Sequence, residues 1–239
     1  MAGTDALLLD LDGTLAPLVP RPDDTILAIS LRRLLIRLQR TLSGRLAIVS
    51  GRTIAVVDRI ISIPSLAIAG VHGLERRGAD GRVTCVTLGA GLAAARRDLS
   101  ALVEQHPRLL LEDKGASLVL HFRMAPEMET IAAAAAETAA SRHGLELQPG
   151  KMVFEVREPG PDKGAALAAF MTEAPFVAAR PIFVGDDVTD ESAFAAAAGL
   201  GGHGVLVGQP RPSAAVFRLD DVADVERWLA DSAAMMEAS

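Results

Sequence analysis

Aromatic residues, cysteine and long uncharged apolar runs are all scarce in this chain of 239 residues. Aromatic side chains make up 3% of the sequence and tyrosine is absent, whereas 50% of the residues are hydrophobic, so the core must be mainly aliphatic. The one cysteine, Cys85, excludes an intramolecular disulfide and any metal site built from several cysteines. We expect Cys85 to be a small buried side chain.

Basic clusters and membrane-length segments are missing as well. The net charge is -6, and no block of lysine and arginine is present that would attract nucleic acid or an anionic membrane surface. No run reaches the roughly 18 uncharged apolar residues of a membrane-spanning helix, and Asp5 and Asp10 interrupt the first apolar stretch, unlike in a signal peptide. We therefore expect a cytoplasmic monomer whose partner is a small molecule, with no nucleic-acid or membrane partner.

Short apolar runs alternate with helical patterns in the first and last thirds of the chain. The expected strands are 6–9, 46–49, 66–69, 181–184 and 205–207, and the expected helices are 24–42, 53–61, 163–171, 189–198 and 221–235. Strand–helix alternation predicts a parallel sheet with helices on both faces. The expected fold class is α/β, with a doubly wound, Rossmann-like core formed by residues 1–81 and 159–239.

The alternation breaks between residues 82 and 158. The expected elements there are a strand (83–88), a helix (92–105), a strand (117–122), a helix (126–142) and a hairpin (145–147 with 152–156). Pro149 and Gly150 are typical turn residues for that hairpin. This order predicts a smaller α+β cap domain inserted into the core.

Polar residues follow the expected strands at the edge where ligands bind in open α/β sheets. Asp10 and Asp12, in Asp10-Leu-Asp12-Gly-Thr-Leu, come directly after the first strand. Ser50 follows the second strand, Lys163 begins a helix, and the acidic run 186–191 follows a later strand. In a doubly wound core these groups converge on a single crevice.

Several carboxylates in one crevice repel each other and raise one another's pKa. A hard divalent cation such as Mg²⁺ relieves this repulsion, and the Ser50 hydroxyl and Lys163 ammonium beside it would hold a phosphoryl group. The pattern predicts phosphoryl transfer in which the Asp10 carboxylate attacks phosphorus and forms an aspartyl-phosphate. Asp12 would then protonate the leaving alkoxide and later deprotonate the attacking water.

Each motif taken alone has a simpler interpretation. Asp-x-Asp-Gly also opens calcium-binding loops, but Leu15 and Arg21 stand where such a loop needs glycine and glutamate. The acids at 186–191 would also favour a helix N-terminus through its dipole, Ser50 alone is a common turn or cap residue, and Lys163 alone would be solvated. Their joint occurrence in this order favours the catalytic interpretation.

As a set, these motifs resemble those of the haloacid dehalogenase-like phosphatase superfamily, and the resemblance covers nearly the whole chain. It implies that Asp10, Asp12 and Asp186 bind Mg²⁺ directly. Asp187 and Asp190 would hold these ligands in position without binding the ion themselves. The insert between the Ser50 and Lys163 motifs is similar to the type-two cap of sugar phosphatases.

Further segments resemble trehalose-6-phosphate phosphatases; they are 50–52, 70–73, 112–115, 121–123, 151–157 and 185–191. This resemblance implies that Glu112, Lys114, Arg123 and Glu155 bind the sugar. Without it, these residues would be read as solvated charges or ion pairs. The implied reaction is Mg²⁺-dependent hydrolysis of trehalose 6-phosphate, the final step of trehalose biosynthesis.

Two alternatives stay open at this point. The same chemistry would serve another sugar phosphate, such as sucrose 6-phosphate or mannosyl-3-phosphoglycerate. A catalytically silent sugar-phosphate sensor could also have this fold, although a pure binder has no need for Asp12. The sequence assigns no role to Arg52, His72 or Arg157.

Overall fold

The computed structural model describes residues 2–19, 21–87 and 89–238, and within these the chain forms two compact units. The first unit contains the chain up to Thr84 and from Pro161 onward, and the second is Cys85–Gly160. The insert expected at 82–158 differs from these bounds by three residues at its start and two at its end. No helix in the described part of the chain is long and apolar enough to cross a membrane.

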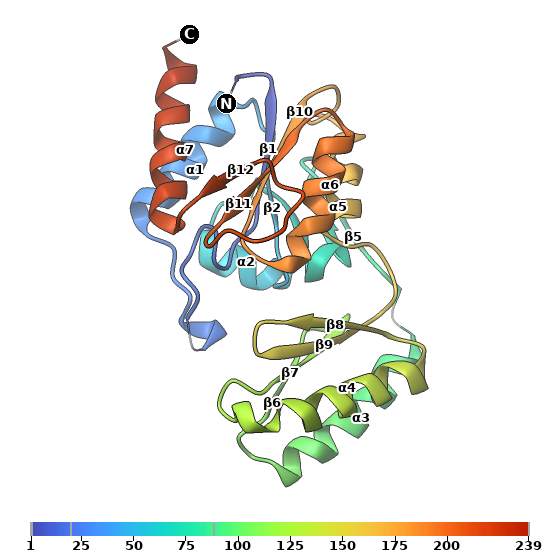
Figure 1. Ribbon diagram of the computed structural model, residues 1–239. Helices are drawn as coiled ribbons and strands as arrows, with labels where there is room; N and C mark the ends of the chain where they lie inside the picture. Colours follow the sequence, from blue (N-terminus) through green and yellow to red (C-terminus); the bar gives the residue numbers. More distant parts are fainter. Residues whose placement is uncertain (1, 20, 88, 239) are drawn as a thin grey trace. The chain divides into compact units, whose positions relative to one another are not determined.

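An eight-stranded sheet forms the centre of the first unit, in the order β12-β11-β10-β1-β2-β3-β4-β5 (Figure 1). The strands are β1 (Asp5–Leu9), β2 (Leu46–Val49), β3 (Ala67–Gly70), β4 (Glu75–Arg77), β5 (Val83–Cys85), β10 (Arg180–Gly185), β11 (His203–Val207) and β12 (Phe217–Leu219). Neighbours from β12 to β3 run parallel, and β4 is antiparallel to β3. The doubly wound α/β prediction is confirmed.

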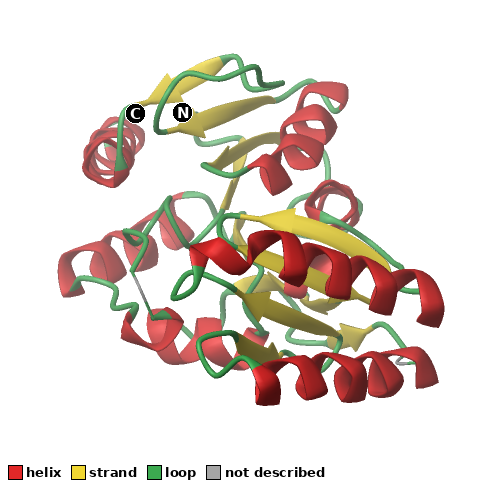
Figure 2. Ribbon diagram, turned by 60° about the horizontal axis from the view of Figure 1, so that its bottom comes forward, coloured by secondary structure: helices red, strands yellow, loops and turns green. Residues whose placement is uncertain are grey.

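Helices cover both faces of this sheet because β1 is apolar on both sides (Figures 1 and 2). Leu7 and Leu9 pack in one core cluster, whereas Ala6 and Leu8 pack in another. The first cluster is closed by α1 (Ile29–Thr41), α2 (Ile54–Ile61) and α7 (Val222–Glu237), and the second by α5 (Lys163–Met171) and α6 (Glu191–Gly199). Single-turn 3₁₀ helices lie at Pro22–Asp24, Val71–Gly73 and Val188–Asp190.

The strand order reverses at β1, which lies between β10 and β2. At such a switch point the loops after neighbouring strands diverge and leave room for a ligand. Asp10 follows β1, Ser50 follows β2 and Asp186 follows β10. The topology therefore brings these three residues to the same sheet edge.

The second unit is a four-stranded antiparallel sheet, in the order β6-β7-β9-β8, with two helices. Its elements are α3 (Ala90–Gln105), β6 (Leu110–Asp113), β7 (Ser117–His121), a 3₁₀ turn (Pro126–Met128), α4 (Glu129–His143), β8 (Glu146–Gly150) and β9 (Val153–Arg157). Leu118, Leu120 and Val156 pack with α3 and α4 on one face. Alternation along the strands turns Val119 and Glu155 to the opposite face.

Two expectations for strands and turns were wrong, and one strand was not expected. The expected strand 83–88 is β5, which belongs to the large sheet of the first unit; Leu88 lies outside the described residues. Strand β6 was not expected, since its apolar run is short and leads into acidic residues. Pro149 and Gly150 lie inside β8, and residues 151–152 make the turn. Proline is tolerated there because β8 is an edge strand.

Two further expectations need correction. Helix α1 begins at Ile29 rather than at residue 24. Pro22–Asp24 form a separate 3₁₀ turn, and residues 25–28 between that turn and α1 are not helical. Cys85 is exposed and not buried, since it lies on β5 at the edge of the large sheet.

The packing predicts a large effect at Phe183, a fully buried residue of β10 whose ring meets Phe194 edge to face at 5.8 Å between centroids. Phe183→Ala should lower the free energy of unfolding by about 3–5 kcal/mol because it leaves a cavity. Phe217→Ala, at a side chain that is 59% exposed, should cost less than about 1 kcal/mol. Urea unfolding can be followed by the fluorescence of Trp228, the only tryptophan. Equal losses in the two variants would contradict this packing.

Candidate active site

The segment after β1 places two carboxylates differently. The Asp10 amide donates to the Val184 carbonyl at 2.9 Å, which extends the pairing of β1 with β10 and fixes Asp10 at the sheet edge. Gly13 then turns the chain with φ +83°, and a β-carbon added there would lie 2.1 Å from an Asp186 carboxylate oxygen. Asp10 is consequently buried, whereas the Asp12 side chain is 30% exposed.

A buried ammonium group joins two of the acids. Lys163 Nζ donates to Asp10 Oδ1 at 2.8 Å and to Asp190 Oδ1 at 2.7 Å, and all three side chains are at most 5% exposed. Lys163 is the first residue of α5, whose N-cap Asp162 accepts a hydrogen bond from the Ala165 amide at 2.8 Å. The start of α5 therefore sets the position of the ammonium group.

The electrostatics of this cluster are dominated by burial and by an excess of negative charge. Burial raises the pKa of Asp10 well above its usual range; Lys163 opposes this rise, and Asp190 and Asp186 add to it. Burial opposes the charge on Lys163, but Asp10 and Asp190 outweigh it and raise the pKa of Lys163. Burial, followed by Asp190 and Asp187, raises the pKa of Asp186 to about 7.

A capping box fixes the acidic loop after β10. The Asp187 amide donates to Asp190 Oδ2 at 2.9 Å, and the Asp187 side chain accepts from the Val188 amide at 2.8 Å. Asp190 therefore bonds both to the loop and to Lys163, and it is fully buried. Its described contacts are those of a residue that holds the loop and the ammonium group together.

The acids fit a divalent cation. Oxygen atoms of Asp10, Asp186 and Asp190 all lie within 4.8 Å of one another. Asp186 Oδ1 is buried and has no hydrogen-bond partner among the described residues, which is costly unless another group binds it. Three carboxylates around the single charge of Lys163 leave an excess of negative charge, and oxygen ligands of this kind suit Mg²⁺ or a similar hard cation.

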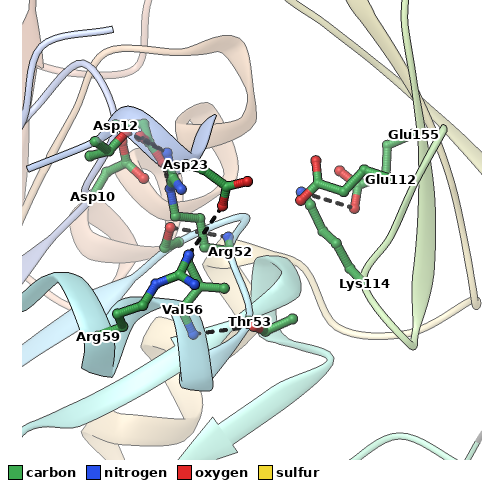
Figure 3. Close-up of polar contacts among 12 residues, drawn as sticks. Asp10, Asp12, Asp23, Arg52, Thr53, Val56, Arg59, Glu112, Lys114 and Glu155 are labelled. Carbon is green, nitrogen blue, oxygen red and sulfur yellow. Dashed lines mark hydrogen bonds and ion pairs between the residues drawn. The ribbon is translucent and has the colours of Figure 1, made fainter. Parts of the chain in front are cut away.

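Asp12 has a different neighbour from the one expected of a metal ligand. Arg52 Nε donates to Asp12 Oδ2 at 2.6 Å, and Arg52 Nη2 donates to Asp12 Oδ1 at 2.8 Å (Figure 3). The same Nη2 donates to the Thr25 hydroxyl at 2.7 Å. Apart from the position of Arg52 two residues after Ser50, no feature of the sequence indicates this contact.

Ser50 lies at the end of β2, fully buried, and its amide donates to the Ala69 carbonyl of β3 at 2.8 Å. Its hydroxyl accepts from the Arg52 amide at 3.2 Å. The same sheet edge thus carries Ser50, Asp10 and Asp186, as the sequence pattern predicted from the strand ends.

The second unit carries a polar cluster on the sheet face opposite α3 and α4. Glu155 is 5% exposed and accepts a hydrogen bond from the Ser117 hydroxyl, and Lys114 Nζ lies 4.0 Å from Glu155 Oε1 (Figure 3). Glu112 shares this row of the sheet, because Val119 pairs with both Glu112 and Glu155. Three of the four residues expected to bind sugar therefore lie on one face.

Further polar contacts on this face involve Glu112 and Arg157. Glu112 Oε2 lies 2.9 Å from His121 Nε2, a neighbour that the sequence did not identify. Arg157 is 2% exposed and donates to Gln148 Oε1 at 3.2 Å, consistent with a structural pairing on this face. Arg123, the fourth expected sugar ligand, is partly buried and lies two residues beyond the end of β7.

A family model and the similar proteins of known function point to the same family. The family model described as trehalose-phosphatase matches residues 8–223. Trehalose-6-phosphate phosphatase of Escherichia coli (strain K12) is 40% identical over 233 residues, which cover 94% of this chain and 85% of that protein.

Solved structures share the fold. The crystal structure of a trehalose-6-phosphate phosphatase related protein has a TM-score of 0.81 and 26% identity, covering 97% of this chain and 98% of that one. A phosphatase of the haloalkanoate (HAD) enzyme superfamily from Bacteroides thetaiotaomicron has a TM-score of 0.65 and 18% identity, covering 97% and 95% of the two chains. The chain therefore has the fold of these proteins.

The raised pKa of Asp186 predicts a pH-dependent stability difference. With a pKa near 7 when folded and about 4 when unfolded, Asp186 takes up a proton on folding between these two pH values. The metal-free wild type should lose this contribution to its free energy of unfolding as the pH rises from about 4 to 7. Asp186→Asn cannot ionise, so its stability relative to the wild type should rise across the same window and stay constant above it.

Urea unfolding in EDTA, followed by Trp228 fluorescence at several pH values, measures this difference. A stability difference between the wild type and Asp186→Asn that does not change with pH would contradict the raised pKa.

Proposed function

We propose that this chain, which belongs to the trehalose-phosphatase family, hydrolyses trehalose 6-phosphate to trehalose and inorganic phosphate. The observation that carries the proposal is the contact of Lys163 with both Asp10 and Asp190 in a buried cluster beside Asp186. A buried carboxylate held by an ammonium group, beside an acid with an unpaired oxygen, is suited to attack a phosphoryl group once a divalent cation balances the negative charge.

Asp10 is the nucleophile in this proposal. Its oxygen attacks phosphorus opposite the sugar oxygen, an O–P bond forms to Asp10, and the bond from phosphorus to the sugar oxygen breaks. Lys163 holds Asp10 in place and would neutralise charge on the phosphoryl oxygens, to which the Ser50 hydroxyl would donate a hydrogen bond. Rigid fixation matters because in-line attack tolerates little misplacement.

Asp12 is the general acid and base. It gives a proton to the sugar oxygen as that oxygen leaves, and it then takes a proton from the water that attacks the aspartyl-phosphate. The second step breaks the bond between phosphorus and Asp10 and releases inorganic phosphate. Asp12 suits this role because its side chain is more exposed than that of Asp10.

Mg²⁺ is the proposed cofactor. Asp10 and Asp186 would hold it, while Asp187 and Asp190 keep the loop in place through the capping box. Asp12 was the third ligand expected from the sequence, but Arg52 binds both of its carboxylate oxygens, so in this proposal its side chain serves proton transfer. When bound, the ion supplies positive charge that stabilises the phosphoryl oxygens and lowers the repulsion between the phosphate and the acids. The unpaired oxygen of Asp186 supports this assignment.

Glu112, Lys114, Glu155 and Arg123 are the proposed sugar ligands. A disaccharide presents hydroxyl groups that both donate and accept hydrogen bonds, and fixed carboxylate and ammonium groups satisfy them selectively. The Ser117–Glu155 hydrogen bond and the Glu112–His121 contact support this proposal, because each holds a sugar-binding carboxylate in a fixed orientation.

A panel of sugar phosphates tests the function. Phosphate release should be faster from trehalose 6-phosphate than from sucrose 6-phosphate or mannosyl-3-phosphoglycerate, by on the order of 100-fold in kcat/KM, because unmatched polar groups are left unpaired with the wrong sugar. EDTA should abolish release, and added Mg²⁺ should restore it.

The other outcomes separate the alternatives. A preference for another sugar phosphate would keep the chemistry and contradict the assigned substrate. Tight binding of trehalose 6-phosphate without phosphate release would indicate a sensor and contradict the enzymatic role.

A further inference from the structure

We infer that Arg52 is a positioning residue that holds the Asp12 carboxylate in the orientation needed for proton transfer. The inference rests on the proposed acid–base role of Asp12. Its observation is the two-pronged contact at 2.6 and 2.8 Å, which occupies one Arg52 nitrogen for each Asp12 oxygen (Figure 3).

The two hydrogen bonds fix the orientation of the Asp12 carboxylate as well as its distance from Arg52. A carboxylate held by one hydrogen bond can rotate about its Cβ–Cγ bond, whereas two parallel N–H···O bonds fix its plane as well. Asp12 needs such support because its side chain is 30% exposed, while that of Arg52 is only 12% exposed. Proton transfer uses one carboxylate oxygen at a time, so the contact with the other oxygen keeps Asp12 in place during the transfer.

Arg52 is itself held at several points. Its guanidinium donates to the hydroxyl of Thr25, a residue that is 6% exposed. Its amide donates to the Ser50 hydroxyl at 3.2 Å, and its carbonyl accepts from the Val71 amide at 2.9 Å. An arginine anchored through both its main chain and its side chain can impose a position on its partner.

The segment that holds the Arg52 carbonyl is unusual. Val71 and His72 have φ values of +47° and +55°, a conformation that is rare for residues other than glycine and a genuine outlier for valine. The His72 amide also donates to the Ser50 carbonyl at 2.9 Å. Residues 71–72 therefore fix the loop of Ser50 and Arg52 from the β3 side, and local strain of this kind accompanies functional sites.

The test uses Arg52→Met, which removes the donors, and Arg52→Lys, which keeps a charge but not the planar two-pronged geometry. Both variants should lower kcat for the sugar phosphate by on the order of 100-fold and change KM by less than about threefold. Arg59→Met is the matched control on α2, since Arg59 pairs with Asp23 at 3.1 Å in an exposed ion pair (Figure 3). It should keep kcat within about twofold of the wild type.

A second readout separates positioning from general damage. Nitrophenolate leaves without a proton, so the first, burst phase of 4-nitrophenyl phosphate cleavage should stay within about threefold of the wild-type rate in Arg52→Met. Asp12→Asn combined with Arg52→Met should be no slower than Asp12→Asn alone, because two residues that act as a unit are not additive. Thr25→Val, which removes only the anchor, should give a smaller loss and serves as a second variant should Arg52→Met fail to fold.

Three results would overturn the inference. They are multiplicative losses in the double variant, a raised KM with unchanged kcat in Arg52→Met, and full activity in Arg52→Lys. These constants are measured on whichever phosphomonoester the wild type cleaves, so a wrong sugar contradicts the proposed function without affecting the test of Arg52. A wild type that cleaves no phosphomonoester contradicts both.

Discussion

The arrangement of the acids depends on the hydrogen bonds that the buried ammonium group of Lys163 donates to two of them. This group lies between Asp10 after β1 and Asp190 beside α6, and it ties together parts of the chain that are 153 and 27 residues away from it. Burial, together with neighbouring acids that this one cation does not balance, raises the pKa values of Asp10 and Asp186. An excess of negative charge of this kind suits a hard divalent cation, which would in turn attract a phosphoryl group.

Most of the core site follows from local sequence rules. Asp10, Ser50 and Asp186 each come directly after an apolar run, and a doubly wound topology brings such strand ends to the same edge. Lys163 follows Asp162, a typical N-cap residue, so the position at the helix start was also predictable. These positions can be predicted from the sequence because each residue directly follows a strand or begins a helix that local sequence patterns identify.

Long-range contacts were less accessible from the sequence. Arg52 and Asp12 are 40 residues apart, and nothing in either motif indicates that their side chains meet. The register that places Glu112 and Glu155 on one row depends on β6, which was not expected, and on a turn at 151–152 rather than at Pro149 and Gly150. Pairing partners across a sheet are set by tertiary packing, and local propensity carries little information about them.

In the proposed mechanism, Asp10 becomes covalently phosphorylated during turnover. Acid quenching within the first turnover of trehalose 6-phosphate, followed by mass spectrometry of the peptide that contains residue 10, measures this directly. We expect a phosphoryl group on Asp10 in the wild type, and neither a phosphorylated peptide nor turnover in a folded Asp10→Asn variant. A phosphoryl group on another residue, or normal turnover by Asp10→Asn, would contradict it.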